Sequence, residues 1–447
     1  MNPIVKGTEP YLASFEQLEK NGWSKSPSWV RSLRKEGISR FAERGFPTIR
    51  DEDWRFTNVD PIAKLPFKPV YEPAPDGLTS KKISQFTFGG LKCSCLVFVN
   101  GHYSKELSSV GPPADGVRIE SLAAAMNGDS GLIEQHLGRH ARCANHTFAS
   151  LNTAFFLDGA FILLPQGKAI EDPIHLLFIA SPHETGAAMH PRNLIIAQKG
   201  CKATIIESYV SLADAPYFTN AVTELVVGEG AVIEHCKFQD EDIHSFHVAT
   251  IQAQLGRNSR FMAHSISTGA RLARNNINTT LDARGIECVL NGLYIAKGDQ
   301  HVDHHMVVDH AKPRCNSHEY YNGILAGRSR GVFHGRILVR KDAQKTDAKQ
   351  TNKNLLLSDE ATIDTKPQLE IYADDVKCTH GATVGQLNEE AIFYLRSRGI
   401  GPEAARQMLV RAFASEILNR LKNESLRDQL DKLLWSRLEP AHSKIPS

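Results

Sequence analysis

The sequence has no long apolar run and almost no net charge. Its most apolar stretch, residues 160–180, is interrupted by Pro165, Lys168, Glu171 and Pro173, so it is too broken for a membrane-spanning helix. The 52 Lys and Arg residues nearly balance the 50 Asp and Glu residues, which leaves a formal charge of +2. We therefore expect neither a membrane nor a nucleic acid as partner.

Cysteine is also scarce, and several common motifs are missing. The eight cysteines are dispersed and form no CxxC pair, which argues against a disulfide framework and a zinc ribbon. The first twenty residues lack an apolar leader and a transit-peptide composition, so we expect a cytoplasmic protein. The chain contains no GxxxxGK[ST] or GxGxxG motif, which favours a scaffold over an enzyme that hydrolyses nucleotides itself.

What the sequence does contain is a repeat in its middle part. From about residue 151 to 385 an apolar strand, a polar turn and another apolar strand follow one another without a long amphipathic helix. The turn glycines Gly200, Gly230, Gly256 and Gly285 are separated by 30, 26 and 29 residues. A period of this length built from strands predicts a mainly β fold, a parallel β-helix, because each unit buries its apolar face only when the next one stacks on it.

Both ends of the chain are predicted to be helical. Ser26 is expected to cap a helix that has Pro27 in its first turn and ends at Gly45, and Asn388 is expected to cap a C-terminal helix that is followed by another from Pro402. We therefore predict an N-terminal helical domain over residues 1–90, a solenoid over 91–385 with a mixed entry segment to about 150, and a C-terminal helical domain over 386–447.

The stretch QHVDHHMVVDH has the composition of a metal site. On a strand, His301, Asp303 and His305 would lie on one face and could bind zinc or iron(II). Polar side chains in solenoids also stack as hydrogen-bonded ladders between turns, and this structural interpretation is favoured.

Two other groups of residues suggest chemistry. Asp342, Asp347 and Asp364 could supply the carboxylates of a carbohydrate-cleaving β-helix enzyme, although such enzymes are usually secreted. Cys378 and His380 are two residues apart and would emerge on the same side of an extended segment, where thiol and imidazole could bind a soft metal or transfer sulfur. As isolated residues they would be ordinary packing.

The carboxyl half closely resembles a known family. The run from Gly331 to about Ile400, which contains KCTHGATVGQL and EEAIFYLRSRGI, resembles the SufB/SufD family of iron-sulfur cluster assembly proteins. HVDHHMVVDHAKPRC, LNTAFFLDGAFI and the cluster around Trp54 extend this resemblance over essentially the whole chain, with the SufD branch as the better match. The resemblance implies a right-handed parallel β-helix flanked by N-terminal and C-terminal helical domains.

The resemblance also implies partners. A SufD-like chain pairs with a SufB-like paralogue through the β-helix and binds a SufC-like ATPase through its C-terminal helical region, with SufS and SufE as sulfur donors to the complex. The chain itself would be non-catalytic, and it would hold no tightly bound cofactor in isolation but share a transient iron-sulfur cluster at the SufB interface. The alternatives are a SufB-like subunit that holds a cluster itself and the carbohydrate-active β-helix enzyme considered above. A homodimer is an expected option for the isolated chain.

Site residues follow from the same resemblance. His380 matches the histidine of the SufD junction motif that faces SufB, where it is a candidate ligand of the nascent cluster, and Cys378 lies beside it as a ligand or as packing. The expected SufC contact comprises Arg396, Arg398, Gly399, Ile400, Met408 and Phe413.

Overall fold

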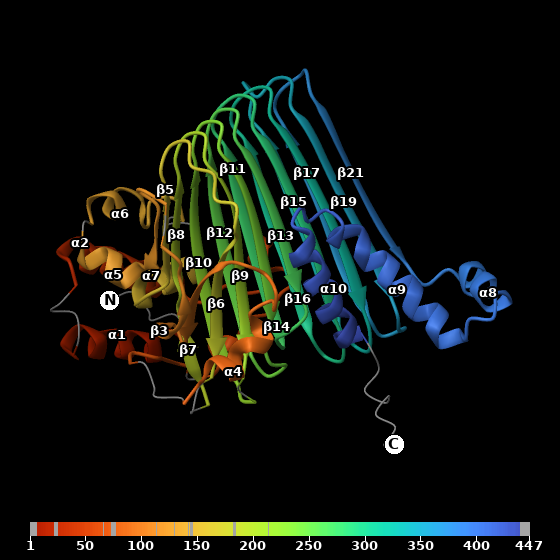
Figure 1. Ribbon diagram of the computed structural model, residues 1–447, viewed down its shortest axis with the longest axis horizontal. Coiled ribbons are helices and arrows are strands. Elements are labelled where there is room, and N and C mark those ends of the chain that lie inside the picture. Colours follow the sequence, from red (N-terminus) through yellow and green to blue (C-terminus); the bar gives the residue numbers. More distant parts are fainter. Residues whose placement is uncertain are drawn as a thin grey trace.

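The computed structural model describes residues 7–21, 26–65, 67–72, 77–112, 114–128, 130–141, 143, 146–181, 185–212 and 214–438. It consists of a long β-solenoid with one group of helices beside its N-terminal part and another beside its C-terminal part (Figure 1). The predicted mainly β fold, a parallel β-helix flanked by helices, is confirmed. None of the helices in the described ranges is long and apolar enough to cross a bilayer.

Two sheets form the walls of the solenoid, and from Arg192 onward successive strands alternate between them. Each of these strands pairs in parallel with the strand two further along the chain, so Leu272 lies opposite His301 and His301 lies opposite Arg330. The earlier part is less regular and contains two antiparallel pairs, Ser94–Val99 with His102–Ser109 and Arg118–Ser121 with Ala160–Leu164. The first sheet contains, in spatial order, β20 (Thr362–Ile371), β18 (Arg330–Val339), β16 (His301–His310), β14 (Leu272–Leu281), β12 (Phe246–Leu255), β10 (Tyr217–Val227), β8 (Arg192–Ala197), β5 (Ala160–Leu164) and β4 (Arg118–Ser121), with β7 (Ala187–Met189) and β1 (Lys68–Pro69) beside this path. The second sheet contains β21 (Lys377–Gly385), β19 (Asp347–Leu356), β17 (Asn316–Leu325), β15 (Glu287–Ala296), β13 (Arg260–Ser267), β11 (Val232–Asp240), β9 (Lys202–Ser211), β6 (Ile174–Ala180), β2 (Ser94–Val99) and β3 (His102–Ser109).

The repeated turns depend on residues that tolerate a left-handed backbone. Gly200, Gly230 and Gly285 lie in turns with φ between 65° and 75°, which residues with a Cβ rarely adopt. At the third predicted turn the left-handed residue is Asn258 with φ of 54°, two positions after Gly256. Asparagine is one of the few side chains that adopt this conformation readily, so the period holds although the glycine position shifts.

Helices cover the outer face of each sheet. The N-terminal group packs on the first sheet through an aromatic cluster in which Phe41 and Phe155 lie beside Phe218 and Phe246 of the strands. This group comprises α1 (Glu9–Asn21), α2 (Ser28–Arg44), η2 (Glu52–Trp54), α3 (Asp60–Ala63), α5 (Leu122–Asn127), α6 (Gly131–His136) and α7 (Thr147–Phe155). The second sheet is covered by α4 (Ser80–Ile83), η3 (Ser84–Phe86), α9 (Pro402–Leu418) and α10 (Glu424–Leu438), while α8 (Glu389–Ser397) projects beyond the last strands.

The predicted helix ends are correct in part. Gly45 ends α2 with φ of 66°, the Asn388 side chain accepts a hydrogen bond from the Ala391 backbone N–H, and Pro402 begins α9. The expected cap at Ser26 is wrong, because Pro27 occupies the cap position and no side chain caps α2. The Ser26 hydroxyl instead accepts a hydrogen bond at 3.2 Å from the Arg34 guanidinium, which lies nearly two turns into the helix.

One fully buried ion pair links the solenoid to the segment after α6. The Arg192 guanidinium donates to a Glu224 carboxylate oxygen at 2.6 Å, and both side chains are completely buried. Glu224 also accepts hydrogen bonds from the backbone N–H groups of Gly138 and Ala141. Burial alone would raise the pKa of Glu224, but Arg192 and these backbone donors hold it below its ordinary value. The carboxylate therefore stays charged and ties the two parts together.

Candidate functional site

The last turn of the solenoid is open. Strands β20 and β21 are the terminal strands of the two sheets, paired with β18 and β19 on one side only. Each presents a row of backbone N–H and C=O groups that are free to pair with another strand. The burial pattern agrees, because β21 is almost entirely exposed whereas the preceding strands of its sheet are largely buried.

Cys378 and His380 lie side by side on this terminal strand. They stand opposite Ala348 and Gln350 of β19, two residues that face the solenoid interior, so both side chains lie on the interior side of the last turn. Cys378 is half-buried against the apolar core, and burial, aided by Asp347, raises the pKa of its thiol. His380 is exposed. One imidazole and one thiol are therefore available to a ligand or partner that binds at the open end of the solenoid.

A buried acid lies directly beneath them. Gln350, opposite His380, is followed one turn deeper by Glu319, and the Gln350 amide contacts a Glu319 carboxylate oxygen at 3.5 Å. Burial raises the pKa of Glu319 from 4.5 to about 8, which the Gln350 contact only partly offsets. Glu319 and Gln350 have room for this contact because the residue that faces them, Gly335, has no side chain. A Cβ at Gly335 would lie 2.8 Å from the Glu319 carboxylate. At neutral pH Glu319 is mainly a neutral acid.

The polar interior continues away from this end. His304 is buried between Tyr294 and Tyr321, with ring centroids 5.2 and 5.3 Å from its own, and neither of its ring nitrogens has a hydrogen-bond partner among the described residues. Burial lowers the pKa of His304 to about 3. Further in, the Lys237 ammonium contacts His247 at 2.7 Å. Titratable side chains thus lie inside the solenoid at several of its turns.

A second exposed feature is the helix α8 beyond the solenoid. Phe393 is 73% exposed and Tyr394 is 57% exposed, whereas Ile392 is buried. Consecutive residues on a helix point about 100° apart, so one face cannot bury all three. Three consecutive apolar residues on a helix, Ile392–Tyr394, are therefore the sequence pattern that could have indicated this exposed pair. The helix presents two aromatic side chains to solvent next to Arg396.

The six residues expected to contact a partner ATPase do not share one surface. Arg396, Arg398 and Gly399 are exposed at the end of α8 and in the turn to α9, and Met408 is 49% exposed on α9. Ile400 is half-buried in the same turn. Phe413 instead packs toward the solenoid, where its carbonyl accepts a hydrogen bond from the Asn322 amide at 3.0 Å.

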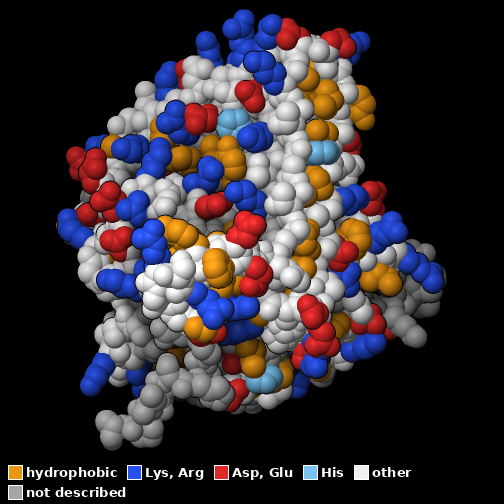
Figure 2. All heavy atoms as spheres, turned by 90° about the vertical axis from the view of Figure 1, so that its right-hand side faces the viewer, with side chains coloured by type: hydrophobic (Ala, Val, Ile, Leu, Met, Phe, Trp, Pro, Cys, Tyr) orange, Lys and Arg blue, Asp and Glu red, His pale blue; other side chains and the backbone are white. Residues whose placement is uncertain are grey.

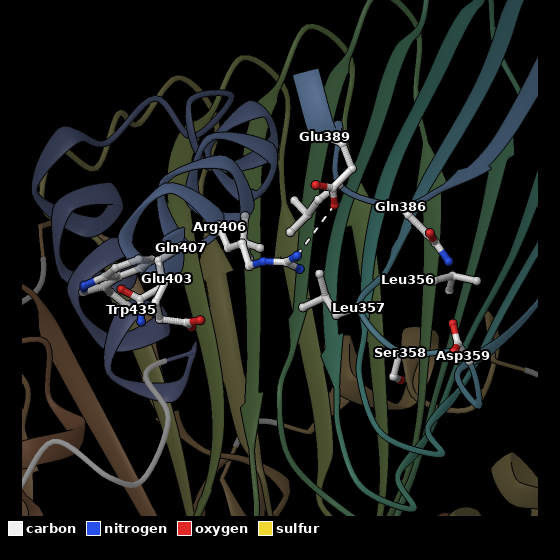
Figure 3. A pocket seen from close by; sticks show the side chains of 12 residues that line it. Leu356, Leu357, Ser358, Asp359, Gln386, Glu389, Glu403, Arg406, Gln407 and Trp435 are labelled. Atoms are coloured by element: carbon white, nitrogen blue, oxygen red, sulfur yellow. Dashed lines mark ion pairs between the residues drawn. The ribbon is translucent and has the colours of Figure 1, made fainter. Parts of the chain in front are cut away.

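The C-terminal helices and the last turns of the solenoid enclose a surface hollow of about 440 Å³ (Figure 3). An ion pair between Arg406 and Glu389 at 3.6 Å spans it and joins α9 to α8. Leu356, Leu357 and Trp435 supply apolar walls. The hollow links the projecting helix to the open end of the solenoid, so a ligand or partner segment in it would contact both.

The histidine-rich stretch is divided between different contacts. The Thr57 hydroxyl contacts His301 at 2.9 Å and donates to Asp303 at 2.5 Å, and Asp303 also pairs with Arg274. These contacts dock the N-terminal segment onto the first sheet, which is a structural role different from a ladder between turns. His305 lies on the same outer face, as the alternation predicts, but it contacts Asp53 instead of joining His301 and Asp303 in one ligand set.

The aspartates considered for carbohydrate cleavage do not share a site. Asp364 is on the first sheet and pairs with Arg330 at 2.6 Å, whereas Asp347 is on the second sheet, near His318. Asp342 is exposed in the turn before β19. Paired carboxylates on either side of a glycosidic bond are therefore missing from this set.

Comparison with known proteins agrees with this architecture. The model of the SUF system FeS cluster assembly SufBD core domain matches residues 178–413, and the model of the SufBD protein N-terminal region matches residues 5–176. This chain belongs to the SufBD family. It is thus an iron-sulfur cluster assembly protein close to SufD.

Individual relatives cover nearly the full length. The SufBD chain is 33% identical over 399 residues to an iron-sulfur cluster assembly SufBD family protein of Synechocystis sp., an alignment of 88% of this chain and 87% of the relative. It is 32% identical over 425 residues to the iron-sulfur cluster assembly protein SufD of Escherichia coli, covering 94% and 95%. SufD of Bacillus subtilis is 23% identical over 449 residues, covering 96% and 98%.

Proposed function

We propose that this SufBD protein is the SufD-like subunit of an assembly scaffold, paired with a SufB-like paralogue through the open end of its solenoid. The observation that carries the proposal is the unpaired edge beside exposed apolar side chains. Apolar groups form a stripe along this end (Figure 2), and Ile371, Tyr372 and Val384 are 40%, 63% and 50% exposed. A long exposed edge with apolar side chains is a pairing site unless it is covered.

Pairing at this end places the sulfur and iron chemistry at the interface. Cys378 and His380 lie on β21 itself, so a partner strand laid along β21 would enclose them. Thiolate and imidazole are suitable iron ligands, and the partner would supply the remaining ligands of a transient cluster that is cargo and not a resident cofactor. Sulfur would come from SufS-like and SufE-like donors through the complex, and the chain would act without catalytic residues of its own.

The His380→Ala variant is expected to assemble with the paralogue and the ATPase but to retain less iron after anaerobic loading, at least several-fold below the wild-type complex. The reason is that an exposed imidazole can be removed without loss of packing. The Cys378→Ser variant distinguishes two roles of the thiol. It should lower the iron and sulfide content if the thiol is a cluster ligand, and leave both unchanged if the thiol only packs against the core. Iron and sulfide are measured in the purified complex, with His318→Gln as a control on the outer surface. Wild-type iron content in His380→Ala would contradict the ligand role.

We further propose that the ATPase binds the C-terminal helices through α8 and the residues beside it, with Arg396, Arg398, Gly399, Ile400 and Met408 around an aromatic centre. Phe393 and Tyr394 supply that centre, since exposed aromatic residues are common energetic anchors of interfaces. Phe413 is left out because it packs toward the solenoid. ATP would be hydrolysed by the partner and not by this chain.

Replacing Phe393 and Tyr394 together by alanine is expected to weaken ATPase binding about 30-fold or more, since each anchor contributes about 1–2 kcal/mol. Binding is measured by isothermal titration with the purified ATPase. The matched control is Tyr372→Ala at the opposite interface, which should weaken binding of the paralogue and leave ATPase binding unchanged. If the double variant binds the ATPase as the wild-type chain does, α8 is not the contact.

A further inference from the structure

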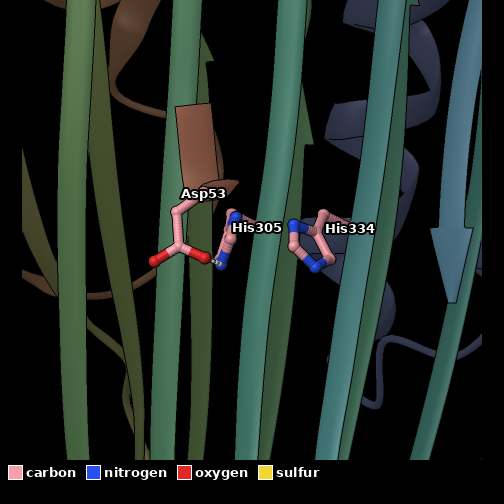
Figure 4. Close-up of side chains that lie close together, drawn as sticks. All are labelled: Asp53, His305 and His334. Carbon is pink, nitrogen blue, oxygen red and sulfur yellow. Dashed lines mark ion pairs between the residues drawn. The ribbon is translucent and has the colours of Figure 1, made fainter. Parts of the chain in front are cut away.

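A three-residue cluster outside the open end has the composition of a metal centre. Asp53 of η2, His305 of β16 and His334 of β18 each offer a ligand atom, and these atoms all lie within 4.8 Å of one another (Figure 4). Two imidazoles and one carboxylate are the ligand set that proteins use for iron(II) and zinc. His334 lies opposite His305 on the neighbouring strand, with ring centroids 4.2 Å apart.

The contact between Asp53 and His305 is too long for a hydrogen bond. The Asp53 carboxylate lies 3.8 Å from His305 Nε2, while two ligands of one zinc or iron ion are separated by roughly 3–3.5 Å when each bond is about 2.0–2.2 Å. His305 is 5% exposed, and its Nδ1 has no hydrogen-bond partner within the described ranges. An ion bound at Nε2 would leave the ring proton on Nδ1, so His305 would bind as a neutral imidazole.

His334 is oriented as a metal ligand would be. Its Nε2 contacts the Gln368 carbonyl oxygen at 3.4 Å, and the Gln368 amide group donates to Glu370 at 2.9 Å, which fixes the direction of the amide. Glu370 is held in turn by Arg336. This chain of contacts leaves Nδ1 of His334 as the nitrogen with a free electron pair, in the way that outer contacts set the tautomer of metal-bound histidines.

Three of the positive charges around the cluster have an acidic partner of their own. Arg274 pairs with Asp303, Lys366 pairs with Glu52, and Arg336 pairs with Glu370. Asp53 makes its ion-pair contact with His305 instead. Asp53 forms no ion pair with lysine or arginine among the described residues, although Arg274 and Arg336 are close enough to act on its charge. The hollow of about 440 Å³ beside it, lined by Asp51, Glu52 and His146, gives an ion access from solvent.

We propose that Asp53, His305 and His334 bind a divalent transition-metal ion of the iron(II) or zinc class. The ion joins η2 of the N-terminal segment to two strands of the solenoid. It lies on the outer face of the first sheet, whereas Cys378 and His380 are on the interior side of the last turn of the second. The inference does not depend on the proposed partners, because the three ligands all belong to this chain.

Titration of the isolated full-length chain with zinc and, anaerobically, with iron(II) tests the site. The Cys378→Ser/His380→Ala background removes the ligands at the open end. One ion per chain is expected to bind, and either Asp53→Asn or His334→Gln is expected to weaken binding at least about tenfold. Gln368→Ala should weaken it less than His334→Gln does. Cobalt(II) serves as a spectroscopic probe, with absorption bands expected in the background protein and lost in both ligand variants.

The matched control is His244→Gln. His244 belongs to the other candidate group, with Asp214 and Asp242, which is exposed or half-buried on the surface. The proposal expects this variant to bind like the background protein. Absence of binding up to 100-fold excess of metal, binding unchanged in Asp53→Asn, or loss of binding only in His244→Gln would each overturn it. Asp53 is exposed and its replacement leaves the core intact, so misfolding does not obscure the result.

Discussion

At pH 8 the Glu319→Gln variant is expected to be more stable than the wild-type chain by roughly 4 kcal/mol, and at pH 5 the two are expected to be nearly equal. Glu319 has a pKa of about 8 in the folded chain and 4.5 as its ordinary value. Between these values the unfolded chain releases a proton that the folded chain retains, so stability falls as pH rises through this window. Glutamine resembles the protonated acid and removes the effect.

The difference in unfolding free energy between variant and wild type, measured with urea from pH 5 to pH 8.5, isolates this contribution from other titrating groups. The control is Glu360→Gln, which changes an exposed glutamate and should leave the pH dependence as in the wild type. A difference between Glu319→Gln and wild type that is independent of pH would show that Glu319 is already ionised in the folded solenoid.

Replacing Arg192 by methionine is expected to lower the free energy of unfolding by about 3–5 kcal/mol, because Glu224 would be left charged and fully buried. Asn152 and Thr153 would also lose their contacts with the guanidinium, at 3.1 and 3.0 Å. Urea denaturation at pH 7 measures the change.

The matched control for Arg192 is Arg328→Met. Arg328 pairs with Asp299, but both side chains are largely exposed, at 65% and 70%, so its loss should cost less than about 1 kcal/mol. Similar costs for the two replacements would mean that the buried pair does not secure the segment after α6 to the solenoid.

The repeat was accessible from sequence because each turn has to solve the same packing problem. Apolar strands joined by polar turns at a nearly constant period predict stacked turns, and the observed pairing of Leu272 with His301 and of His301 with Arg330 follows that period. The turn at Gly256 was misplaced by two residues, since asparagine can replace glycine where the backbone is left-handed. The local sequence alone does not show which of Gly256 and Asn258 adopts the left-handed conformation.

The site was accessible only where its residues are neighbours in sequence. The spacing of Cys378 and His380 predicts one shared side, and the structure has them on the interior side of β21. Their exposure depends on the solenoid ending at that strand, which no local pattern shows. The cluster of Asp53, His305 and His334 was beyond sequence reasoning, because it requires the docking of η2 on the first sheet. His301 and Asp303, two residues apart on the outer face of β16, serve that docking instead.

The most direct test of the proposed function is co-expression of the tagged chain with the SufB-like and SufC-like proteins of its own genome, followed by native mass determination of the purified material. The account predicts a complex that contains all three chains. It predicts less ATPase in the complex of the Phe393→Ala/Tyr394→Ala variant and less paralogue in the complex of the Tyr372→Ala variant. Recovery of this chain alone or as a homodimer in the presence of both proteins would contradict it.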